Sequence, residues 1–66
     1  MSTIDTRLLE QPSTRAALLA VATEMRDSSL VVDISTIRAA MNWEWFHAAY
    51  AMRFHGVWKE LGIKPH

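Results

Sequence analysis

The three tryptophans, two phenylalanines and one tyrosine of the chain all lie in one segment, from Met41 to Gly62. A chain of 66 residues buries only about 60% of the surface that it exposes when unfolded, and it rarely buries three tryptophans completely. The rings of this segment must therefore divide between core and surface. How they divide decides both the fold and the candidate site.

The chain contains no cysteine, which excludes disulfides and thiolate metal sites. A core this small then gains its stability from tight helix packing or from self-association. We expect a single helical domain over residues 1–66, and both a monomer and a homodimer remain open.

Seven basic and seven acidic side chains give a net charge of zero, which weighs against binding driven by nucleic-acid phosphates. Residues 1–33 carry three basic and five acidic side chains, whereas residues 34–66 carry four basic and two acidic ones. The chain begins without the basic and apolar regions of a signal peptide, and no apolar run reaches the roughly 18 residues that cross a bilayer. We expect a cytoplasmic protein without membrane contact.

The periodicity predicts four helices. Residues 2–11 form the first, with Ser2 and Asp5 spaced as in a capping box, and Pro12 stops it. Residues 13–27 form the second, with Ser13 as N-cap. Its expected buried stripe consists of Leu18, Val21, Ala22 and Met25.

The second half of the chain begins with an extended stretch at residues 30–33. Asp33 then caps a helix over residues 34–41, and Asn42 makes a tight turn because it tolerates a left-handed backbone. The fourth helix is expected to run unbroken from Trp43 to Leu61, with Gly62 as its C-cap.

A helical wheel separates the aromatic rings of the fourth helix into two faces. The expected core stripe contains Trp43, Phe46, Tyr50, Phe54, Val57 and Leu61, with Trp58 on its flank. The opposite face carries Trp45 among smaller side chains, namely Ala48, Ala49, Met52 and Gly56. This back face either packs on the first helix of the same chain or contacts another molecule. In the second case the protein interface consists of Trp45, Ala49, Met52 and Gly56.

Residues 34–53 resemble the generic helix-turn-helix of bacterial DNA-binding proteins, over about a third of the chain. The five positions of that motif that must be apolar are filled by Ile37, Met41, Trp43, Ala48 and Ala51. Asn42 stands where the turn usually has glycine, but Arg38 stands where a small residue is usual. The expected fold class is thus all-α, a compact bundle of three to four short helices with a helix-turn-helix-like C-terminal pair.

The resemblance implies a small, dimeric transcriptional regulator that binds double-stranded DNA with the start of the fourth helix in the major groove. The residues facing the DNA would then be Glu44, Trp45 and His47, and the phosphate contacts would come from Arg38, Arg53 and Lys59. The first group lacks the arginine, lysine, asparagine and glutamine that read bases best. The alternative is a helical protein-interaction module, an adaptor or inhibitor that uses the face of Trp45 and Met52.

Catalysis finds little support in the sequence. His47 and His55 lie eight residues apart, about 12 Å along a helix, and no glutamate stands at metal-site spacing. The chain has no nucleophile motif and no glycine-rich phosphate loop. We expect a protein that is not an enzyme, without metal or cofactor.

Overall fold

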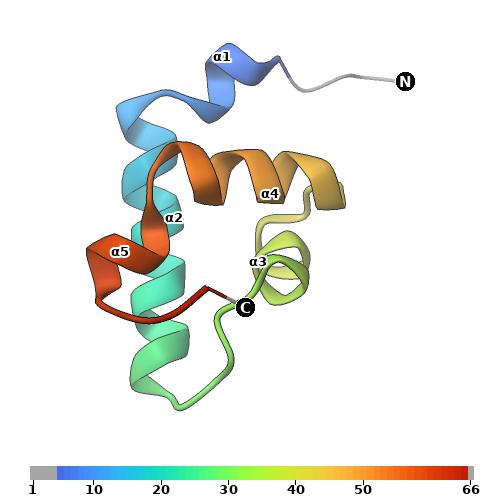
Figure 1. The fold of residues 1–66 in the computed structure, drawn as a ribbon. Coiled ribbons are helices and arrows are strands. Elements are labelled where there is room, and N and C mark those ends of the chain that lie inside the picture. The colour runs from blue at the N-terminus through green and yellow to red at the C-terminus, as the bar shows by residue number, and fades with distance from the viewer. Residues whose placement is uncertain (1–4, 66) are drawn as a thin grey trace.

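The computed structural model describes residues 5–65 and shows an all-α bundle, as the sequence predicts. Its helices are α1 (Thr6–Leu9), α2 (Pro12–Asp27), α3 (Ile34–Met41), α4 (Trp45–Phe54) and α5 (Val57–Leu61). Figure 1 shows α4 lying crosswise to the long helix α2, with α1 on one side of α4 and α3 on the other. The most extensive contact is between α3 and α4.

The first two helices begin differently from the prediction. Asp5 is the N-cap of α1, where its carboxylate accepts the backbone N–H of Arg7 at 2.9 Å. The predicted partner Ser2 lies outside the described residues. Helix α2 begins at Pro12 itself, with Gln11 as N-cap, so the assignment of Ser13 as N-cap is wrong. Proline suits a first helical position because it has no N–H to leave unsatisfied.

The boundaries of α3 follow the sequence prediction. The Asp33 carboxylate accepts the N–H of Thr36 at 2.8 Å, and the Thr36 hydroxyl accepts the N–H of Asp33 at 3.0 Å, which together form a capping box. Asn42 has φ +58° and ψ +43°, the left-handed conformation that reverses the chain after α3.

The predicted fourth helix is two helices. Its first residue is Trp45 rather than Trp43, and it ends at Phe54. Gly56 has φ +58°, a left-handed conformation that a helix cannot contain, and the chain turns there into α5. Gly62 ends α5 with φ +69°, which confirms it as C-cap.

All helices contribute to one core. Its buried apolar residues are Leu9, Leu18, Ala22, Val32, Ile34, Ile37, Ala48, Ala49, Ala51, Met52, Val57 and Trp58. In the predicted stripe of α2, Leu18 and Ala22 are buried, while Val21 and Met25 pack at its edge. Across residues 5–65, the helices are too short or too polar for any of them to traverse a bilayer.

Candidate interaction surface on helix α4

Helix α4 turns the face with the smaller side chains inward. Its buried residues are His47, Ala48, Ala49, Ala51 and Met52. The predicted core stripe is wrong for this helix, because Phe46, Tyr50 and Phe54 are exposed. Of the other predicted stripe members, Val57 is buried, and Trp43 and Leu61 are half-buried against the core.

The small residues explain this orientation. Alanines at the inner face let α4 approach α3 closely, and the volume that they leave is filled from elsewhere in the chain. The turn at Gly56 places Trp58 in the core, where its indole Nε1 donates to the carbonyl oxygen of Val32 at 3.0 Å. A buried indole needs such an acceptor, because an unpaired N–H costs the chain about 1–3 kcal/mol.

The predicted protein interface is therefore corrected. Met52 is fully buried and Ala49 nearly so, and Gly56 is half-buried. These residues pack within the same chain, mainly against α3 and less against α1, whereas the intramolecular alternative placed this face on the first helix. Trp45 is the one member of that set that is exposed.

Four large rings on the outside of α4 form what we call the aromatic face: Trp45, Phe46, Tyr50 and Phe54. Their exposed fractions are 52%, 59%, 37% and 52% respectively. The rings of Tyr50 and Phe54 stack, with centroids 5.9 Å apart and planes 20° apart. A shallow groove runs over this face, and Ala49 and Arg53 complete its lining.

The face is tied to the first helix by one polar contact. The Tyr50 hydroxyl donates to the carboxylate of Glu10, the residue that ends α1. This hydrogen bond raises the pKa of the Tyr50 phenol, and partial desolvation and the negative charge of Glu10 act in the same direction. The contact fixes one ring of an otherwise apolar surface.

The residues predicted to contact DNA do not come together. Trp45 and Arg53 share the outside of α4, and Glu44 is the exposed N-cap of that helix. His47 is buried, so its assignment as a DNA-facing residue is wrong. The two remaining cations, Arg38 and Lys59, are exposed on α3 and α5.

His47 of α4 and His55, the C-cap of α4, both face inward, but they differ in their hydrogen bonds. The Nε2 of His55 donates to the Leu9 carbonyl oxygen at 2.7 Å, and the His55 carbonyl oxygen accepts Nη1 of Arg15 at 2.7 Å. The buried Nδ1 of His47 has no hydrogen-bond partner among the described residues. In residues 5–65 no three His, Cys, Asp or Glu side chains are grouped so that they could hold a metal ion.

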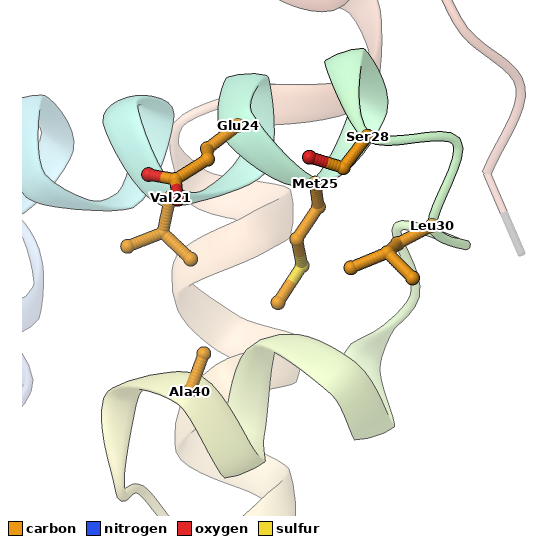
Figure 2. A pocket seen from close by; sticks show the side chains of 6 residues that line it. All are labelled: Val21, Glu24, Met25, Ser28, Leu30 and Ala40. Atoms are coloured by element: carbon orange, nitrogen blue, oxygen red, sulfur yellow. The ribbon is translucent and has the colours of Figure 1, made fainter.

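A second groove lies between the end of α2 and α3. Figure 2 shows Val21 and Met25 pointing from α2 toward Ala40 of α3, with Leu30 closing one end. Glu24 is the only charged residue of its lining. Val21 and Met25 belong to the edge of the core, so this groove is an indentation of the helix packing and offers less apolar surface than the aromatic face.

The groove over the aromatic face offers apolar contact, the phenol of Tyr50 and the guanidinium of Arg53. Sequence reasoning missed Phe46, Tyr50 and Phe54 as surface residues. The sequence signal that could have revealed their exposure is Gly56, because a helix break there separates the aromatic stripe from Val57 and Trp58.

No protein-family model, curated protein sequence or solved structure matches the chain.

Proposed function

We propose that this protein is a small protein-interaction module that binds its partner through the aromatic face of α4. One observation carries the proposal: four large aromatic side chains stand half-exposed on a single helix whose inner face is already packed. Tryptophan, tyrosine, phenylalanine and arginine are enriched at protein interfaces, and all four occur in this groove.

The way in which the face is held also supports binding. Helix α4 rests on α3 along its inner side, and the rings project from a fixed helix rather than from a loop. Rings with few rotatable bonds lose little conformational entropy on binding. The exposed apolar residues are contiguous along the groove, whereas singly scattered ones need no explanation.

Photo-crosslinking tests the proposal. We would place a benzophenone amino acid at Phe46 or at Phe54, and at Ala20, an exposed residue of α2, as the control. Irradiation of cells that produce the protein should give protein adducts from positions 46 and 54 and none from position 20. Equal labelling from all three positions, or no adduct from any, would refute an interaction through the aromatic face.

DNA binding is the second candidate, and one observation favours it. An eight-residue helix, a three-residue turn with left-handed Asn42, and a second helix occupy residues 34–54 in the lengths of a helix-turn-helix. Three of the five apolar motif positions are fully buried and the other two, Met41 and Trp43, pack on the core. Arg38 is exposed, which is compatible with its unusual position in the motif.

A mobility-shift titration separates the two candidates. DNA binding predicts retardation of a mixed-sequence duplex at low salt, and the retardation should weaken in the Arg38→Ala and Arg53→Ala variants. Because both candidates use the outer face of α4, Phe46→Ala should impair either of them. Arg53 lines the groove of the aromatic face and serves either candidate, so Arg38→Ala, on α3, is the variant that distinguishes them. No shift at protein concentrations of about 10 µM, where even non-specific binding begins, would remove this candidate.

A further inference from the structure

We infer that the partner of the aromatic face is an acidic segment of another protein, one that presents apolar side chains next to aspartate or glutamate. This inference rests on the proposed function, because it gives the chemistry of the partner at the same surface. Its basis is the unequal way in which the basic side chains of the two halves of the chain are paired.

The arginines of the first half are neutralised within the molecule. Each of the three forms one ion pair with a carboxylate. The pairs are Arg7 with Asp5, Arg15 with Glu60 and Arg26 with Asp27, with nitrogen–oxygen distances of 2.9, 2.7 and 3.3 Å respectively. These cations already have partners, so they offer little charge to another molecule.

The basic side chains of the second half are not neutralised in this way. Within residues 5–65 none of them forms an ion pair, and they are Arg38, Arg53, Lys59 and Lys64. Of the two acids in this half, Glu60 is engaged by Arg15, and Glu44 is the other. Residues 34–65 therefore present four uncompensated cations against one carboxylate, although the net charge of the whole chain is zero. Such a surface favours an acidic partner.

Arg53 brings this uncompensated charge into the groove of the aromatic face. In the described part of the chain it is the one charged residue of the lining, and the four rings and Ala49 make up the rest. Glu10 of α1 accepts the Tyr50 hydroxyl and makes no ion pair with Arg53. A guanidinium beside aromatic rings favours a carboxylate, because a bound apolar segment excludes water and strengthens a charge-assisted hydrogen bond.

The charges also differ between the two ends of the face. Glu44 is exposed at the start of α4, whereas Arg53 lies in the last turn and Lys59 follows on α5. A partner that lies along the groove should therefore place its acidic side chains toward the C-terminal end of α4, away from Glu44.

A protein segment fits these features better than a nucleic acid does. Affinity for nucleic acids comes largely from several phosphate contacts made together, whereas this groove has one cation among four rings. An acidic protein segment needs one or two carboxylates at Arg53, and it gains the rest of its affinity from apolar contact with the rings.

Selection from a library of random peptides displayed on phage tests the inference. The native chain would be immobilised, and a chain with both Phe46→Ala and Phe54→Ala would be used in parallel to remove peptides that bind elsewhere. Peptides enriched on the native chain alone should combine aromatic or large aliphatic residues with an excess of aspartate and glutamate over lysine and arginine. Circular dichroism would verify that each variant is folded.

A synthetic copy of the most enriched peptide then allows a comparison of variants matched in charge. Arg53→Gln and Ala20→Glu each lower the net charge by one, but only the first changes the groove. By fluorescence anisotropy, Arg53→Gln should weaken binding about tenfold, and Ala20→Glu should change it by about twofold or less. Glu44→Gln, at the opposite end of α4, should leave binding unchanged or strengthen it.

Four results would overturn the inference. They are the absence of peptides that prefer the native chain to the double variant, enriched peptides with no excess of acidic residues, a peptide that binds Arg53→Gln as tightly as the native chain, and a mixed-sequence DNA duplex that binds more tightly than the best peptide. The last result would assign the uncompensated charge to nucleic acid. None of them decides the proposed function, since crosslinks from positions 46 and 54 to a protein of any charge would sustain it.

Discussion

The two faces of α4 differ in a way that inverts the usual amphipathic helix. The inner face is built from alanines, one methionine and histidine, and it is buried, whereas the outer face carries four large aromatic rings that are half-exposed. Burial of a large apolar side chain is normally worth about 1.5–3 kcal/mol. A helix that leaves four such side chains outside forgoes a large part of the stabilisation available to a small domain.

The difference indicates what each face is for. Small inner side chains set how closely α4 approaches α3, while leucine, isoleucine and valine residues of other elements and Trp58 provide the volume of the core. The outer rings add little to that core, so their apolar area remains available for another molecule. The four predictions that follow test this division of roles, beginning with the largest effect.

Alanine substitution should separate the two faces most clearly. Met52→Ala removes a fully buried side chain and should cost about 2–5 kcal/mol, which is comparable to the whole stability of a domain of this size. Phe46→Ala removes a larger but exposed side chain and should change stability by about 0.5 kcal/mol or less. Urea unfolding followed by circular dichroism at low micromolar protein would measure both. Similar costs for the two variants would show that the outer face is also part of the core.

The inner face holds two histidines that form a matched pair for the second prediction. His55→Leu removes the donor to the Leu9 carbonyl oxygen, which lies at the end of α1, and should cost about 1–3 kcal/mol. His47→Leu removes a buried nitrogen that has no partner among residues 5–65, and it should leave stability unchanged or raise it. The same urea measurement checks both variants. A loss at His47 as large as that at His55 would mean that its ring has a structural role comparable to that of His55.

The sequence predicted those parts of the fold that depend on a few neighbouring residues. The capping box of Asp33, the left-handed turn at Asn42 and the C-cap at Gly62 each follow from local chemistry, and the structure contains all three. The direction of α4 could not be predicted in the same way. Both of its faces have apolar residues at helical spacing, and the choice between them depends on how α2, α3 and α5 fill the core.

The candidate site was missed for the same reason. If residues 43–61 form one helix, Phe46, Tyr50 and Phe54 share one apolar stripe with Val57. A stripe of that kind is expected to face the core, so these rings were predicted to be buried. The left-handed Gly56 rotates the second part of that stripe into the core and leaves the first part outside. Of the four rings of the aromatic face, only Trp45 was expected to be exposed.

The third prediction concerns the turn that sets which face of α4 meets α3. Asn42 holds φ +58°, and the N–H of the next residue, Trp43, donates to the carbonyl oxygen of Arg38 at 3.0 Å. Asn42→Ala should cost about 1 kcal/mol, because alanine resists the left-handed conformation, and Asn42→Gly should cost less or nothing. Thermal unfolding of the three proteins gives the order. An alanine variant as stable as the glycine variant would mean that this conformation does not hold the turn.

The smallest effect is expected where the outer face touches the rest of the molecule, at the hydrogen bond from Tyr50 to Glu10. The bond needs a protonated phenol and raises the pKa of Tyr50 above its ordinary value of about 10. A raised pKa means that the folded state holds this proton more tightly than the unfolded state. The contribution of this hydrogen bond to stability is therefore complete below about pH 10 and disappears as the pH rises through the pKa of Tyr50 in the folded state.

The titration of Tyr50 can be followed by absorbance at 295 nm, because Tyr50 is the one tyrosine of the chain. The midpoint should lie above that of the urea-unfolded chain, and Glu10→Ala should lower it. If Glu10→Ala leaves the midpoint unchanged, the outer face has no such anchor on α1, and the contrast between a packed inner face and a free outer face becomes sharper.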